Sequence, residues 1–191
     1  MLPPRVAWFQ ASARRAARGA GDEFSIVSAT RPRDLARLLK LARGRHRVAE
    51  LGTGTAWTAI SLALADSRRR VTAFDPVVRP ERERYLGLVG ARTRDRIELV
   101  DAPGERGPAP GQEVDLLFVD SSHEREATVR EFEAWRPALA PGAVVAFDDY
   151  HHPDYPGVRE AIAQLGLTGE RQGTLFVHRH RAGGEDARAG S

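Results

Sequence analysis

Three aspartates stand where apolar segments of the sequence end. Asp120 follows VDLLFV, and the adjacent Asp148 and Asp149 follow AVVAF. If these segments are neighbouring parallel strands, their carboxyl ends share one edge of a sheet and the three carboxylates meet there. Converging carboxylates repel one another unless a cation neutralises them, and oxygen ligands suit Mg²⁺, Ca²⁺ or Mn²⁺ better than Zn²⁺. The acids therefore predict a divalent-cation site, with helix capping by Asp120 or Asp149 as the alternative.

Histidines follow these acids closely. His123 comes three residues after Asp120, and an imidazole is well suited to proton transfer near neutral pH. We interpret His123, with Asp120 beside it, as a candidate catalytic pair in which the imidazole is the general base. The alternatives for His123 are a polar residue in the first turn of a helix and a ring that stacks on an adenine. His151 and His152 are further ligands or substrate contacts, or residues of a loop surface.

A glycine-containing turn, ELGTGTAW, follows the first expected strand. Gly52 and Gly54 allow the backbone to turn tightly and to approach a ligand, and the next helix begins just beyond them. Asp75 ends the next expected strand, at about the 20-residue distance at which an acid takes ribose hydroxyls. Trp57 occupies the third small position of the nicotinamide-binding pattern, and Glu50 would hold a ligand's ammonium group. The pattern favours an adenosine cofactor other than a nicotinamide dinucleotide.

Strands and helices are expected to alternate along most of the chain. Apolar runs predict strands at 47–51, 71–74, 96–100, 114–119, 143–147 and 173–179. Helices are predicted over RPRDLARLLKLARG and at 57–65, 81–89, about 123–136 and 157–165. The segment 102–113 holds three Pro and three Gly, so this crossover is expected to be a loop. The pattern predicts an α/β fold: a doubly wound, mostly parallel sheet with helices on both faces.

The length of 191 residues suits a single domain with one core. We expect an N-terminal arm or lid at 1–30, the folded domain at 31–179 and a disordered tail at 180–191. The chain has no Cys, which excludes disulfides, thiolate metal sites and Cys nucleophiles. No apolar run is long enough to cross a membrane, and the patch from Val6 to Phe9 is too short for a signal peptide. These features predict a cytoplasmic protein that does not bind a membrane.

Positive charge is concentrated near the N-terminus. Residues 1–47 hold ten Arg and one Lys against three acidic residues, although the whole chain has a net charge of only +3. Such a segment would bind nucleic acid or an anionic substrate, or it would form a solvated helix face. The solvated face is the simpler interpretation.

Two segments resemble a known family. VAELGTGTAWTAISLALA resembles motif I of class I S-adenosylmethionine-dependent methyltransferases, and it is closest to the catechol and caffeoyl-CoA O-methyltransferase branch. Ala56, Trp57 and Thr58 stand where that branch has Gly-Tyr-Ser. VDLLFVDSSHEREATVREFEAWRPALAPGAVVAFDDY is similar to bacterial O-methyltransferases that modify sugars and natural products. The resemblance covers about residues 25–178 and implies a Rossmann-like methyltransferase fold.

The resemblance also implies a reaction and a set of site residues. It implies transfer of a methyl group from S-adenosylmethionine to a hydroxyl group of a small molecule. Related enzymes hold a divalent cation with acids at positions that match Asp120, Asp148 and Asp149, and Mg²⁺ is the expected ion here. His123 stands where catechol-type enzymes carry a Lys general base. The expected cofactor-binding residues are Glu50, Gly52, Thr53, Gly54, Thr58, Asp75, Pro76, Asp101, Ala102 and Asp120.

The residues leave two other functions open. An RNA methyltransferase would use the basic N-terminal segment, but the sequence shows no RNA-binding module or interleaved aromatic and basic residues. A non-catalytic cofactor-binding protein on the same fold is the other alternative. The expected partners are a small hydroxylated acceptor and a second copy of the chain in a homodimer, and nucleic acid is not expected.

Overall fold

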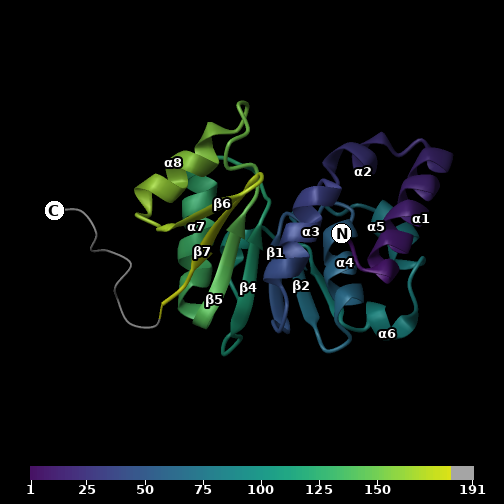
Figure 1. Cartoon of the computed structure of the whole chain (residues 1–191), viewed down its shortest axis with the longest axis horizontal. Coiled ribbons are helices and arrows are strands. Elements are labelled where there is room, and N and C mark those ends of the chain that lie inside the picture. Colours follow the sequence, from purple (N-terminus) through teal and green to yellow (C-terminus); the bar gives the residue numbers. More distant parts are fainter. Residues whose placement is uncertain (182–191) are drawn as a thin grey trace.

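A seven-stranded sheet forms the centre of the computed structural model, which describes residues 1–181 (Figure 1). The strands lie in the order β3-β2-β1-β4-β5-β7-β6. Their bounds are β1 Arg47–Leu51, β2 Arg70–Phe74, β3 Ile97–Val100, β4 Val114–Val119, β5 Leu139–Phe147, β6 Gly169–Gln172 and β7 Leu175–Arg179. Strands β1 to β5 pair in parallel, whereas β7 pairs antiparallel with β5 and β6 antiparallel with β7. The predicted doubly wound, mostly parallel α/β fold is confirmed.

Helices pack on both faces of this sheet. They are α1 Pro4–Ala20, α2 Glu23–Ser28, α3 Pro32–Leu41, α4 Trp57–Ala65, α5 Glu81–Leu86, α6 Ala91–Arg94, α7 Arg125–Trp135 and α8 Pro156–Gln164. Two short 3₁₀ turns, η1 Gly104–Arg106 and η2 Arg136–Ala138, complete the elements. No helix within residues 1–181 has the length and apolarity needed to span a bilayer.

Side chains of the strands other than β6 alternate between two apolar clusters on opposite faces of the sheet. Val48 of β1 and Phe118 of β4 belong to the cluster covered by α1, α3, α4 and α5. Leu51 of β1 and Phe147 of β5 belong to the other cluster, which α7 and α8 cover. Because successive strand residues point to opposite faces, a run of apolar residues fills both clusters at once.

The C-terminal part of the sheet differs from the prediction. The expected single strand at 173–179 is a hairpin, in which β6 and β7 flank a turn containing Gly173 with φ +70°. Strand β6, with the sequence GERQ, is exposed over most of its length and lacks the apolar pattern that marks a strand. Strand β5 begins at Leu139 instead of 143, with a register shift between Val114 and Leu116 of its partner.

The helix expected at 81–89 is also shorter. Helix α5 ends at Leu86, and a separate single-turn helix, α6, follows. Gly87 and Gly90 stand between the two helices, where glycine lowers helix propensity. The segment 102–113 contains only the 3₁₀ turn η1, so the prediction of a crossover without an α-helix is confirmed. Of the tail predicted to be disordered, 182–191 lies outside the described residues.

Candidate active site

The glycine turn after β1 lies against the end of β4. The backbone N–H groups of Gly52 and Thr53 donate to the carbonyl of Phe74 at 2.8 and 3.1 Å. Gly52 has φ +87°, and a Cβ at this position would lie 2.0 Å from the carbonyl oxygen of Asp120. Only glycine allows the two strand ends to come this close. The turn thereby brings the predicted cofactor loop beside the predicted catalytic residues.

The carboxylate of Asp75 is held at the end of β2 by backbone donors. Its Oδ2 accepts from the N–H of Gly54 at 2.8 Å, and its Oδ1 accepts from the N–H of Val77 at 2.8 Å. The side chain is largely buried but reaches the cavity described below. Asp75, the residue predicted to bind the ribose, is thus held against the glycine loop.

Arg82 of α5 joins the cofactor loop to the ends of β2 and β3. Its Nε donates to the carbonyl of Gly54 at 2.8 Å, its Nη1 donates to Asp101 at 3.0 Å, and its Nη2 donates to the carbonyl of Val77 at 2.8 Å. The side chain is buried although it carries a charge. Arg82 was not among the predicted site residues, because nothing in ERERYL distinguishes it from its exposed neighbours.

Glu50 is buried near the C-terminal end of β1. Its Oε2 accepts a hydrogen bond from the hydroxyl of Thr53 at 3.0 Å, and the residue is 1% exposed. Burial raises the pKa of Glu50 to about 8, and the charges of Asp120 and Asp75 add to the rise. A positively charged group beside Glu50 would lower this pKa again, because it favours the ionised carboxylate.

The predicted catalytic pair is in contact. His123 Nε2 lies 3.3 Å from Asp120 Oδ1 and 3.5 Å from Asp149 Oδ2, so the imidazole faces two carboxylates. Burial raises the pKa of Asp120 to about 7, and the charges of Asp148 and Asp149 act in the same direction. His123 and Asp149 both have positive φ, +60° and +52°, which is unusual for residues other than glycine.

Asp148 is more deeply enclosed than the other two acids. Its Oδ1 accepts from the hydroxyl of Thr174 at 2.7 Å and from the backbone N–H of Asp149 at 2.8 Å. Burial raises the pKa of Asp148, and the charges of Asp149 and Asp34 raise it further. The carboxylates of the three aspartates therefore crowd one another, as the sequence predicted.

The crowding does not amount to a metal site in the observed arrangement. Among residues 1–181, no group of three or more His, Asp or Glu side chains is placed to hold a metal ion. The imidazole of His123 instead contacts both Asp120 and Asp149. The donor chemistry of three carboxylates fits a divalent cation, whereas their positions do not form a ready set of ligands.

Two histidines stack on one tyrosine beside these acids. The ring of Tyr155 lies 4.6 Å from that of His123 and 4.6 Å from that of His152, with interplanar angles of 21° and 29°. His151 points elsewhere: it is exposed and contacts the ring of Tyr150. The structure therefore places His152 at the site and leaves His151 at the surface.

One cavity of about 800 Å³ joins these groups. It is lined by the expected residues Glu50, Gly52, Thr53, Gly54, Thr58, Asp75, Pro76, Asp120, His123, Asp148 and Asp149. Asp101 and Ala102 do not line it, and Asp101 instead receives the hydrogen bond from Arg82. The Thr58 hydroxyl pairs with that of Thr30 at 2.8 Å. The N-terminal residues Phe24, Val27 and Ser28 line another part of the same cavity.

The family of the chain follows from a sequence comparison. A family model described as a methyltransferase domain matches residues 49–150. This match spans more than half of the 191 residues, and the chain belongs to the methyltransferase-domain family. None of the curated protein sequences matches the chain.

Solved structures of methyltransferases have a similar fold. The O-methyltransferase TomG of Streptomyces achromogenes, involved in tomaymycin synthesis and solved with S-adenosylmethionine, has a TM-score of 0.66 and 21% identity over 96% of this chain and 92% of that one. An O-methyltransferase of Bacillus cereus in complex with S-adenosylhomocysteine has a TM-score of 0.65 and 16% identity, covering 88% and 90%. CalS11, a TDP-rhamnose 3′-O-methyltransferase of calicheamicin biosynthesis, has a TM-score of 0.60 and 21% identity, covering 76% and 78%. The TM-scores establish a shared fold.

Proposed function

We propose that this methyltransferase transfers the methyl group of S-adenosylmethionine to a hydroxyl group of a small molecule. The observation that carries the proposal is the single cavity in which the glycine turn, Glu50 and Asp75 face the pair of His123 and Asp120. The structural likeness to TomG, which was solved with S-adenosylmethionine, supports the choice of donor. The likeness to O-methyltransferases supports a hydroxyl acceptor.

The residues along the cavity fit the parts of this donor. Asp75 offers a carboxylate to ribose hydroxyls, and Glu50 offers one to the ammonium of the methionine part. The glycine turn leaves room for the backbone to approach the ligand, because Gly54 faces the cavity with only the tips of Phe24 and Ser28 within 4 Å of its Cβ position. When bound, S-adenosylmethionine supplies an activated methyl group at a sulfonium centre.

His123 is the proposed general base. Burial alone would lower the pKa of His123, but the hydrogen bond and the negative charge of Asp120, together with the charges of Asp149 and Asp148, raise it. The imidazole would accept the proton of the acceptor hydroxyl, and the two neighbouring carboxylates would stabilise the imidazolium that results. The polar side chains of Arg31, Asp34 and Thr174 line the same cavity and suit a hydroxylated acceptor.

A first experiment tests both halves of this proposal. Calorimetry should show that the wild-type protein binds S-adenosylhomocysteine and that Asp75→Asn weakens this binding at least about tenfold, because a hydrogen-bonded carboxylate is lost. With a panel of sugars and phenols as acceptors, His123→Gln should lower turnover roughly 100-fold without changing affinity for S-adenosylhomocysteine.

His151→Gln is the matched control, because His151 is exposed and does not line the cavity. It should leave both turnover and affinity unchanged. A wild-type protein without affinity for S-adenosylhomocysteine would overturn the proposal. Binding without turnover on any acceptor would favour a non-catalytic cofactor-binding protein instead.

A divalent cation is the second part of the proposal. Asp120, Asp148 and Asp149 would be its ligands. Burial raises the pKa values of Asp120 and Asp148, the charges of neighbouring aspartates raise them further, and a cation would relieve that repulsion. Titration with Mn²⁺, followed by electron paramagnetic resonance, should show binding to the wild type. Binding should be lost in the double variant Asp148→Asn/Asp149→Asn. If the wild type binds no Mn²⁺, the cation is removed from the proposal and His123 acts without it.

A further inference from the structure

Glu131 is a buried carboxylate that the proposed reaction does not use. It lies on α7, is 6% exposed, and lines the same cavity as Asp75 and His123. It sits between two loops, one after β3 and one after β4, strands that β2 and β1 separate in the sheet. Gly104 lies in the loop after β3, and Ser121 lies in the loop after β4. A mostly buried carboxylate is costly to ionise unless hydrogen bonds compensate for its lost hydration.

Only one oxygen of Glu131 has a partner within residues 1–181. Oε2 accepts a hydrogen bond from the hydroxyl of Ser121 at 2.5 Å, and this contact fixes the orientation of the group. Among residues 1–181 no hydrogen bond reaches Oε1. Oε1 is not one of the buried atoms left without a partner, so it is accessible from the cavity that Glu131 lines. Burial raises the pKa of Glu131, while the hydrogen bond from Ser121 acts in the opposite direction.

The space beside Oε1 is kept open by a glycine. A Cβ on Gly104 would lie 2.7 Å from Oε1 and 3.1 Å from the side chain of Leu51. The indole N–H of Trp135 donates to the carbonyl of Gly104 at 2.8 Å, so the loop after β3 is fixed against α7. Glu131 and residues of this loop both line the cavity.

The place proposed for the ribose, at Asp75, suggests which part of the cofactor lies near Glu131. In adenosine cofactors, the purine is attached at C1′ and the 5′ substituent at C4′, so the two groups extend from opposite ends of the ribose. If Asp75 binds the ribose and the methyl group must reach His123, the purine extends to the other part of the cavity, where the loops after β3 and β4 meet. A purine with a 6-amino group carries N–H donors on the edge that would meet Oε1.

We propose that Glu131 recognises the adenine of the cofactor by accepting a hydrogen bond from its 6-amino group at Oε1, while Ser121 holds Oε2. This inference rests on the cofactor of the proposed function. It makes Glu131 a specificity-determining residue, because the O6 of a 6-oxo purine is an acceptor and cannot form a hydrogen bond with Oε1, which is also an acceptor. Selectivity for adenine over hypoxanthine is the measurable consequence.

The experiment compares two ligands by calorimetry: S-adenosylhomocysteine and its 6-oxo analogue, S-inosylhomocysteine. The wild type should bind the adenine form at least about tenfold more tightly. Glu131→Gln should lower this ratio at least about tenfold, because the amide of Gln offers a donor to the 6-oxo group and an acceptor to the 6-amino group. A purely structural Glu131 would change both affinities alike and leave the ratio unchanged.

Glu133→Gln is the matched control, because Glu133 lies on the same helix but is exposed. The ratio of its affinities for S-adenosylhomocysteine and S-inosylhomocysteine should equal that of the wild type. The inference is overturned if the wild type binds both ligands equally, a result that needs no variant to fold, or if Glu131→Gln keeps the wild-type ratio. A wild type that binds neither ligand would instead overturn the proposed function, and this inference with it.

Discussion

At the scale of single residues, Glu50 links the site to pH. Its pKa is about 8 in the folded protein against an ordinary value of 4.5, because burial disfavours the ionised form. Between these two values the folded state keeps a proton that the unfolded state loses. The contribution of Glu50 to the free energy of unfolding is therefore fully present below about pH 4.5 and is lost as pH rises to about 8. Glu50→Gln should remove this decline, so urea titrations should show the variant gaining stability relative to wild type from pH 5 to pH 8.

The exposed Glu133 provides the control for this prediction. Glu133→Gln should keep the pH dependence of the wild type, because Glu133 is exposed and lies outside the site. If Glu50→Gln and wild type lose stability in parallel between pH 5 and pH 8, then Glu50 is ionised in the folded protein and its burial is compensated.

Residue types and their spacing along the chain are enough to predict part of this site. Strand ends place Glu50, Asp75 and Asp120, because parallel strands bring their carboxyl ends to one edge. Arg82 and Glu131 cannot be predicted in this way, since their contacts depend on which helix face meets which loop. The contact of His123 with Asp149 is equally hard to foresee, because both residues have positive φ, which their types do not indicate.

At the scale of elements, the site depends on how closely the turn after β1 approaches the end of β4. Gly52→Ala would place a Cβ 2.0 Å from the Asp120 carbonyl oxygen at a φ of +87°. Gly44→Ala is a matched control, because its φ is +72° but no atom lies within 4 Å of the Cβ position. The control should cost roughly 1–2 kcal/mol of unfolding free energy from backbone strain alone. Gly52→Ala should cost more and should also abolish calorimetric binding of S-adenosylhomocysteine.

Equal losses in the two variants would show that the turn and the end of β4 can separate without loss of stability.

The elements themselves were largely predictable: 47–51, 57–65 and 114–119 match β1, α4 and β4 as observed. These segments are mostly apolar, and their burial in the core decides their structure. The hairpin of β6 and β7 was missed because its outer strand is polar and is held by pairing to its neighbour.

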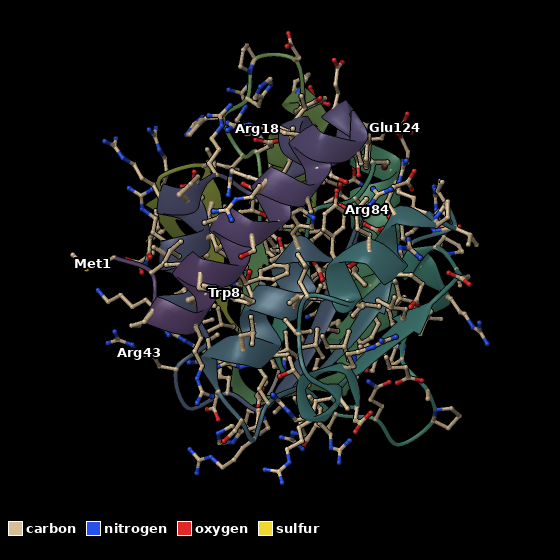
Figure 2. All side chains as sticks on the ribbon, turned by 90° about the vertical axis from the view of Figure 1, so that its right-hand side faces the viewer. Met1, Trp8, Arg18, Arg43, Arg84 and Glu124 are labelled. Carbon is tan, nitrogen blue, oxygen red and sulfur yellow. The ribbon has the colours of Figure 1, made fainter. Side chains whose placement is uncertain are left out.

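At the scale of the whole molecule, the N-terminal segment packs as a layer outside α4. Helix α1 is the outermost helix on its side of the molecule and carries Trp8 on its surface (Figure 2). Its inner face is buried. The ring of Phe9 packs edge-on against that of Trp57 with 6.5 Å between ring centres, and Gln10 Nε2 donates to the Ser61 hydroxyl at 3.0 Å. Trp57 begins the helix that follows the glycine turn. The segment predicted to be an arm or lid at 1–30 therefore packs against α4, the helix that directly follows the glycine turn.

This packing leads to a prediction about the boundary of the folded unit. Phe9→Ala should lower the free energy of unfolding by about 3–5 kcal/mol, because it leaves a cavity between α1 and α4. Trp8→Ala, at a side chain that is 60% exposed, should change it by no more than about 0.5 kcal/mol. Urea denaturation of the full chain measures both. If Phe9→Ala costs no more than Trp8→Ala, then α1 is detachable and the folded domain begins near residue 31. If the difference is observed, the domain includes α1, since a helix whose inner face completes the core cannot act as a lid without exposing that core.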